Sequence, residues 1–403
     1  MPYVWSSNHR LVYVPWDTDI PNKNREANNS LVSETLFYLE GKMFDRWIDD
    51  TSGVARNNGQ NENNLISTPP YTAEDILRSY VFSERDLRTT TVTDTTHIII
   101  SGLKSSVDDY YNYTIYHNIT NDHKTYVSDY VGSTKTLVLA SADVNATVAD
   151  NIVITNIKGD EKIDIASFDL VGNTTNGTRK DWAFGRSIAR IESAEQTIAQ
   201  LCLESHCLFF TSFNKYRIVA LDAASSADTW TLSLKARGTE FFDARLTPLN
   251  HVFSSFRLRY AYSYAKGDYT KEFYVDKNGY TSGGTVISAT EKTLCSNAET
   301  NYRVKNNFEY SSDWIYDLTT AEYLLQKLVG WYSKQRLVIK WATPLHDSSF
   351  DYIKYELGDQ VKLNNSRIIP TGLNNSSYFM IVGKQIIIQP GNSYIVFKLN
   401  EMG

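Results

Sequence analysis

The sequence predicts a β-dominated α+β protein. Aromatic residues make up 13% of the 403 residues, and 27 of them are tyrosines. Short runs rich in Val, Ile, Tyr and Thr recur along the chain, and these residues suit the pleated, half-buried surface of a strand. A few stretches instead carry apolar residues at helical spacing. The length is sufficient for two or three domains.

Residues 1–93 are predicted to form an N-terminal arm and a first segment with helices. The aromatic residues before residue 20 lie among polar ones, which suits short strands or an arm. Residues 30–50 carry a broad apolar face at helical spacing, and residues 51–64 form a polar loop. After two prolines, Thr72 is expected to cap a second helix, and acids in its first turn complement the helix dipole.

Residues 94–158 differ from the preceding residues in their pattern of short strand-like runs, which predicts an inserted small β-barrel or sandwich. Five short strand-like runs recur at regular spacing, separated by turn-prone residues. The expected strands are residues 97–100, 113–116, 125–128, 136–139 and 152–154.

Residues 159–240 predict a helix followed by strands. Ser193 and Gln196 are spaced as a capping box, in which each side chain satisfies a backbone donor of the other residue. A helical face follows, up to Ser205. The expected strands are residues 207–210, 216–219 and 230–234.

Residues 241–403 predict a strand, a long helix and a β-rich end. Thr319 and Glu322 form another capping box, which is expected to open a helix over residues 320–335. The expected strands are residues 254–264, 337–341, 360–363, 378–382, 386–388 and 394–399.

Charge and hydropathy exclude several classes of protein. The net charge of −6 and the scattered Lys and Arg argue against binding nucleic acid by phosphate neutralisation. No stretch approaches the roughly 18 apolar residues of a membrane-spanning helix. Residues 1–16 lack the layout of a signal peptide, so synthesis in a cytoplasm is expected. The sequons at Asn112 and Asn118 are then expected chance matches.

Three groups of residues could hold a metal ion, and each has a plainer interpretation. Cys202, His206 and Cys207 lack a fourth ligand, so core packing is favoured, and with Cys295 the three cysteines form no disulfide framework. His117 and His123 flank a turn-like stretch and fit a hairpin end. Residues 276–279 resemble the start of a calcium loop, but position twelve holds Ile287 and not Glu, which favours a hairpin turn.

No catalytic constellation is found. The pairs Asp108-Asp109 and Asp49-Asp50 could serve glycoside hydrolysis, but adjacent acids in a strand point to opposite faces. Aromatic side chains could stack on sugars, although they are more often core residues in β-rich chains. No nucleophile elbow, phosphate loop or dinucleotide motif occurs. We therefore expect no enzyme activity, no catalytic residues, no cofactor and no metal.

Two long segments carry ordered motifs. The first contains a Ser-Phe motif ending at Phe168, an aromatic motif starting at Trp182, the helix after Ser193, and a strand pair ending near Asp222. Upstream lies a proline followed by a helix ending in Ile-Leu, at residues 70–78. Downstream, residues 320–401 hold a helix, a strand, a Leu-Gly-Asp-x-Val turn and two final strands. This order resembles the hub and tail-tip proteins of bacteriophage tails.

A second resemblance covers residues 105–155. The segment is similar to a small β-module that recurs in phage tail and tail-fibre proteins. It interrupts the hub-like pattern between Leu87 and Ile163, as an insertion at an exposed loop would. The module usually has Gly after its tyrosines, where this chain has Asn112. Asn, like Gly, tolerates a positive φ.

The resemblance implies two tube-like β-barrel units with packed helices in each chain. A homotrimer would then present six units to the six-fold tail tube, as a baseplate hub at its distal end, and phage DNA would pass through the lumen without specific binding. The implied partners are a tail tube or distal tail protein and a central spike or fibre. The implied location is the virion, after synthesis in the bacterial host. Gly358 and Asp359 would form the turn that leads into a strand.

Two rival functions stay open. The runner-up is a receptor-binding or carbohydrate-binding tail adhesion protein, which should bind glycans through exposed Tyr or Trp. A β-rich glycosidase or peptidoglycan hydrolase would need two acids on facing strands, one with a raised pKa, and the sequence offers no such pair.

Overall fold

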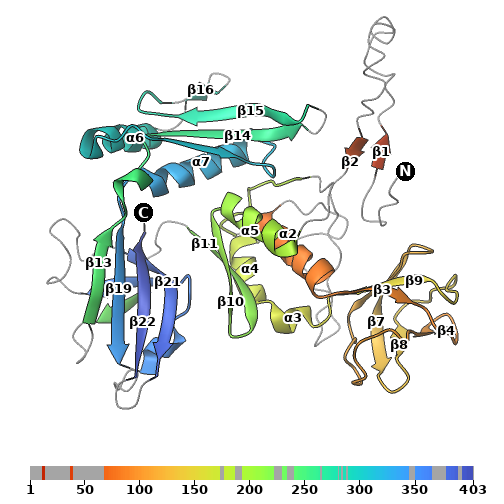
Figure 1. The fold of residues 1–403 in the computed structure, drawn as a ribbon. Helices are drawn as coiled ribbons and strands as arrows, with labels where there is room; N and C mark the ends of the chain where they lie inside the picture. Colours follow the sequence, from red (N-terminus) through yellow and green to blue (C-terminus); the bar gives the residue numbers. More distant parts are fainter. Residues whose placement is uncertain are drawn as a thin grey trace, which may run out of the picture. The chain divides into compact units, whose positions relative to one another are not determined.

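A computed structural model describes most of the chain from residue 68 onward. The described residues are 11–13, 37–39, 68–172, 177–186, 193–221, 229–233, 240–263, 266–279, 281–282, 285–286, 289–344, 350–364, 378–388 and 393–402. Most of the described elements are strands, and helices occur among them without regular alternation (Figure 1). The β-dominated α+β class is therefore confirmed. Among the described residues, no helix is long and apolar enough to span a bilayer.

The chain divides into two compact units. Unit 1 comprises Met1–Cys202 with Asn214–Arg217 and Ser263–Asp268, and unit 2 holds the remainder. Two of the boundaries fall inside helix α5 (Ala194–Glu204) and strand β11 (Lys215–Ala220). Hairpin β10–β11 therefore contributes residues to both units.

Unit 1 contains a seven-stranded antiparallel sheet, which we call the β-module, over residues 84–155 (Figure 1). Its order is β3-β9-β6-β7-β8-β5-β4, so the strand that enters the module pairs with the strand that leaves it. The sheet starts ten residues before residue 94, where the sequence pattern changes. Its strands are β3 (Glu84–Arg88), β4 (Thr91–Val92), β5 (His97–Ile99), β6 (Ile115–Asn118), β7 (His123–Val131), β8 (Thr136–Leu139) and β9 (Asn151–Thr155).

The core of the β-module combines aliphatic and tyrosine side chains. Tyr111 stacks edge-on against Tyr130 at 4.8 Å between ring centroids, and both rings are buried. Every buried member of the core lies on a strand or on the loops that close the module. The members are Leu87, Ile98, Ile100, Leu103, Tyr111, Tyr116, Val127, Tyr130, Leu137, Leu139, Ile152 and Ile154.

Short helices lead into and out of the β-module. Helix α2 (Pro69–Ile76) continues as a π-helix, η2 (Leu77–Val81), directly before β3, and α3 (Gly159–Lys162) and α4 (Ile165–Gly172) follow β9. Gly172 lets α4 approach α2 closely, because a Cβ there would lie 3.1 Å from the Pro70 side chain. Strand β1 (Leu11–Tyr13) pairs with β2 (Phe37–Leu39).

Unit 2 contains a six-stranded sheet that curls around an aromatic core (Figure 1). Its order is β12-β20-β21-β22-β19-β13, antiparallel except for the parallel pair β12–β20. We call it the C-terminal sheet. Its strands are β12 (Thr229–Ser233), β13 (Glu240–Leu246), β19 (Leu337–Pro344), β20 (Gln360–Asn364), β21 (Tyr378–Ile387) and β22 (Tyr394–Glu401).

The turn at Gly358 and Asp359 leads into β20, as predicted. Gly358 has a φ of +86°, and a Cβ there would lie 2.8 Å from Val219, so both the backbone and the space favour glycine. The Asp359 carboxylate accepts a hydrogen bond from the Glu356 amide at 2.8 Å and closes the turn.

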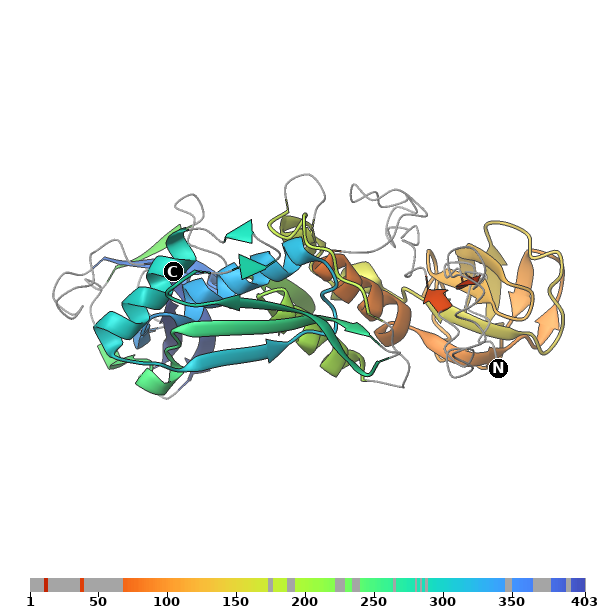
Figure 2. The same ribbon diagram turned by 90° about the horizontal axis from the view of Figure 1, so that it is seen from above.

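Unit 2 also contains a three-stranded sheet, β15-β14-β18, and two helices. The strands are β14 (Ser255–Ser263), β15 (Asp268–Val275) and β18 (Asn307–Ser311), and the helices are α6 (Ala289–Tyr302) and α7 (Leu318–Tyr332). Both views show α7 lying along this sheet (Figure 2), and Tyr332 stacks on Phe308 of β18 at 5.3 Å. Short strands β16 (Thr281–Ser282) and β17 (Thr285–Val286) pair with each other.

Three predicted helix starts were wrong. Residues 37–39 form a strand and not part of a helix over 30–50. Helix α2 begins at Pro69, before Thr72, because proline suits the first helical position, where no N–H partner is needed. Helix α7 is capped by Asp317 and not by Thr319: the Asp317 carboxylate accepts from the Thr320 amide at 2.9 Å.

Two predicted local conformations were also wrong. Residues 378–388 give one strand, β21, with a bulge between Ile381 and Gly383, where two strands were expected. In the β-module, the left-handed residues near the tyrosines are Asp109 and Tyr113, at φ +62° and +63°. Asp108 and Asp109 therefore lie in a turn and not in a strand.

Candidate functional site

The candidate metal residues lie in ordinary structural positions. Cys202, Cys207 and Cys295 form no disulfide and are buried, and burial raises the pKa of the Cys295 thiol to about 12. His206 packs edge-on against Trp331 at 5.5 Å between ring centroids. Among the described residues, no three His, Cys, Asp or Glu side chains are grouped as metal ligands would be.

The two turn predictions are confirmed. His123 pairs with Asn118 at the end of hairpin β6–β7, and the His117 ring lies 3.3 Å from the Asp122 carboxylate. Asp276 and Gly279 form an isolated antiparallel bridge, with Gly279 at a φ of +90°. The sequon residue Asn118 is fully buried, so a glycan could not attach there. The pair Asp49-Asp50 lies outside the described residues.

A buried polar group in the β-module escaped the sequence analysis. Asp143 and Asp150 are almost fully buried, and the Asn118 amide donates to both carboxylates, at 2.9 and 2.8 Å. The Tyr116 hydroxyl and the Asn121 amide also donate to Asp143. Burial raises the pKa of Asp150, but hydrogen bonds from Asn118 and Thr147 together outweigh this effect and hold that pKa below its ordinary value. We call this group the acid–amide cluster.

A second buried carboxylate, Glu84, anchors the start of β3. The Tyr111 hydroxyl donates to one oxygen at 2.6 Å, and the Lys104 backbone amide donates to the other at 3.1 Å. Burial and the nearby carboxylate raise the pKa of Tyr111 above its usual value. Glu84 therefore holds the start of β3 to the loop that contains Lys104 and Tyr111.

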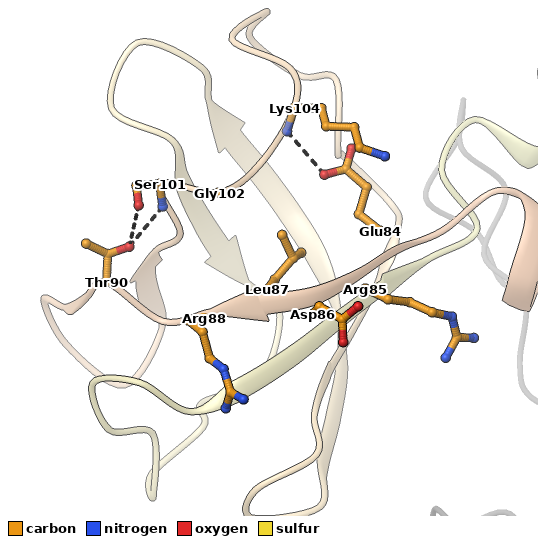
Figure 3. Close-up of a pocket in the computed structure, with 9 residues that line it drawn as sticks. All are labelled: Glu84, Arg85, Asp86, Leu87, Arg88, Thr90, Ser101, Gly102 and Lys104. Carbon is orange, nitrogen blue, oxygen red and sulfur yellow. Dashed lines mark hydrogen bonds between the residues drawn. The ribbon is translucent and has the colours of Figure 1, made fainter.

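A shallow cleft of about 370 Å³ lies beside β3 (Figure 3). One side is β3 itself, where Asp86 takes a φ of +59° in a bulge between Glu84 and Leu87. The other side is the loop that contains Ser101, Gly102 and Lys104. Arg85, Asp86 and Arg88 point away from that loop, so the charged groups do not converge on one point (Figure 3).

An entry clamp joins the β-module to its helices. Arg78 in η2 is 1% exposed, and its guanidinium donates to Glu74, Asn156 and Asp160. Two backbone hydrogen bonds run alongside, from Asn156 to Arg78 and from Ile157 to Phe82. The segments before and after the module are thus joined at one buried cation, which we call the Arg78 clamp.

The tip of hairpin β10–β11 displays a bulky apolar side chain. Strand β10 (Cys207–Ser212) and β11 are joined by Phe213 and Asn214, with φ of +48° and +63°. Two consecutive left-handed residues are typical of a type I′ hairpin loop, which favours Asn and Gly. Phe213 is 77% exposed. A large apolar residue in a left-handed position, with little burial, is unusual.

The comparisons with known proteins give only distant similarities. No protein-family model and no curated protein matches the sequence. A tail protein from Neisseria meningitidis MC58 is 10% identical, over 63% of this chain and 75% of its own, with a TM-score of 0.35. The 43 kDa tail protein of prophage MuSo2 from Shewanella oneidensis is 10% identical, over 78% and 90%, with a TM-score of 0.33. A chain in the virion of a native gene transfer agent particle is 11% identical, over 66% and 63%, with a TM-score of 0.34.

Proposed function

We propose that this chain is a structural protein of a phage tail, which forms a trimeric hub at the distal end of the tail tube. The order of motifs in the sequence supports this role. Several of those motifs coincide with described elements: helix α2, helix α4, helix α5 with the β10–β11 hairpin, and α7 with the C-terminal sheet. In this proposal the chain adapts six-fold to three-fold symmetry, lines the DNA channel and contacts tube and spike proteins.

The exposed side chain of Phe213 is the observation that carries an assembly role. A single chain gains little from this placement, because the ring is 77% exposed, with the Lys384 amine 6.0 Å from its centroid, and the backbone adopts a disfavoured conformation. A neighbouring subunit that buried the ring would recover the transfer free energy of a large aromatic side chain. The hairpin itself belongs to the segment whose sequence resembles hub proteins.

Light scattering with negative-stain imaging of the purified chain tests this proposal. We expect a mass of three chains and rings with an open lumen. Phe213→Asn should shift the mass toward the monomer, because Asn suits the left-handed position and leaves the hairpin intact. Leu170→Asn is the matched control, since Leu170 is 71% exposed on helix α4.

Two results would count against the proposal. A compact monomer at tens of micromolar would contradict self-assembly. An oligomer that survives Phe213→Asn unchanged would show that this hairpin is not the contact.

The alternative, an adhesion protein that binds glycans, has one specific observation in its favour. Tyr80 and Tyr316 are 54% and 49% exposed, and sugars stack on such rings. The Arg85 guanidinium already lies over the Tyr80 ring, 4.6 Å from its centroid, where it would compete with a stacked sugar. Glycan-array binding that is lost in Tyr80→Ala or Tyr316→Ala would favour this function over the hub.

A further inference from the structure

The β-module is joined to the rest of unit 1 by two adjacent segments. The chain enters through the π-helix η2 and leaves through residues 156–160. Two covalent connections that lie side by side allow a rigid body to swing, much as a hinge does, unless other contacts prevent it. The orientation of the module therefore depends on what joins the two segments.

The Arg78 clamp joins these two segments at a buried cation, beside more exposed contacts in which Arg85 donates to the Ser79 carbonyl and the Lys158 amine lies 5.2 Å from the Tyr110 ring centroid. Its guanidinium is 1% exposed and reaches Glu74 on the helical side at 2.9 Å, and Asn156 and Asp160 on the exit segment. Glu74 is fully buried, and the Asp160 side chain is 10% exposed. The planar guanidinium can hold three acceptors in fixed directions at once, which the point charge of a lysine could not do.

The backbone around the clamp is unusual on both segments. Arg78 lies in a π-helix, a rare conformation that often marks functional positions. Asn156 and Lys158 have left-handed φ values of +61° and +51°. Gly159 allows the close approach, since a Cβ there would lie 2.3 Å from Asn156 Oδ1 and 2.7 Å from Arg78 Nη1. Contacts with surrounding residues hold these backbone conformations in place, and the clamp lies buried among those contacts.

We propose that the Arg78 clamp is a conformational lock, which fixes the orientation of the inserted β-module on helices α2 and α3. Opening the lock turns the module into a hinged appendage while its own sheet stays folded. The module can change its orientation without unfolding, because it has its own hydrophobic core, and none of the buried core residues belongs to the clamp. This inference does not depend on the proposed assembly role.

Distance measurements between two spin labels test the lock in the full chain. One label is placed at Val107→Cys on the module and the other at Leu170→Cys on α4, which are 65% and 71% exposed. The native cysteines are buried, and the chain without added cysteines gives the background. We expect one narrow distance distribution in the otherwise unchanged protein.

Two variants open the lock from opposite sides. Arg78→Gln removes the cation, and Gly159→Ala pushes a methyl group against Asn156 and Arg78. Both should broaden the distance distribution. Arg88→Gln is the matched control, because Arg88 is an exposed arginine of the same module, bonded to the Ala149 carbonyl at 3.3 Å, and should leave the distribution narrow. Amide hydrogen exchange in β6 and β9 should stay slow in all three variants.

Three outcomes would overturn the proposal. The first is a broad distribution without any clamp substitution, and the second is a narrow one in both clamp variants. The third is loss of exchange protection in β6 and β9 of both variants, which would show that Arg78 supports the fold of the module and not its orientation. If Arg78→Gln does not fold, Gly159→Ala decides between these outcomes.

Discussion

The β-module and the C-terminal sheet are both curled, mainly antiparallel sheets, but different interactions hold them together. The module buries the carboxylates of Asp143 and Asp150 and satisfies them with amides and hydroxyls. The C-terminal sheet is held by aromatic packing, with Trp341 stacked on Phe397 at 5.7 Å and edge-on to Tyr352 at 5.4 Å. The module should therefore respond to acid and to the loss of single polar groups, while the C-terminal sheet should respond to lost volume.

The largest effect is expected in the aromatic core. Trp341→Ala should destabilise the C-terminal sheet by about 3–5 kcal/mol, because removing this fully buried side chain leaves a large cavity. Chemical denaturation measures the loss, and hydrogen exchange should place it in β19 and β22. Trp341→Phe is the control and should cost less, since the indole N–H has no acceptor among the described residues. Equal exchange in the β-module and the C-terminal sheet would contradict separate cores.

A smaller effect is expected from the acid–amide cluster. Asn118→Ala should destabilise the β-module by about 1–3 kcal/mol, because it removes a donor that two buried carboxylates share. Hydrogen exchange should rise in β6 and β9, while β19 and β22 stay protected. Asn145→Ala is the control, because Asn145 is exposed and lies in the loop between Asp143 and Asp150. Unchanged exchange in β6 would mean that the cluster does not hold the sheet.

The smallest effect is a pH dependence confined to the β-module. The pKa of Asp150 is lowered in the folded chain, so its contribution is present above the unfolded value of about 3.9 and is lost as pH falls through the folded value. Stability of the module should therefore decline below about pH 4, measured by hydrogen exchange of β9 between pH 3 and 6. Asp150→Asn should flatten this profile. A decline of the same size in β22 would contradict the contrast between the two sheets.

Phe213 and the Arg78 clamp also differ in exposure and in proposed role. Phe213 displays an aromatic ring at a hairpin tip, whereas the Arg78 clamp hides a cation at the base of the inserted module. The first placement favours contact with another chain, and the second favours a fixed internal orientation. We expect the proposed hub to depend on the former for assembly and on the latter for the direction in which the module points.

The sequence by itself determined the class of fold and most strands. Periodicity is local, so runs such as residues 136–139 and 394–399 are recognisable without any knowledge of their partners. The long helix near residue 320 was predictable from its apolar periodicity, and the Gly358 turn because turns depend on a few adjacent residues. Helix starts were less certain because several Thr, Asp and Pro residues compete as caps within one turn.

Only the tertiary structure decided which polar residues matter. Asp143, Asp150 and Asn118 are ordinary loop and strand residues in the sequence, and their burial follows from loops that meet at one end of the β-module. Arg78 reads as one of many basic residues, yet its partners Asn156 and Asp160 lie about eighty residues away in the chain. Hydrogen bonding between distant segments depends on three-dimensional packing, which no local pattern of residues records.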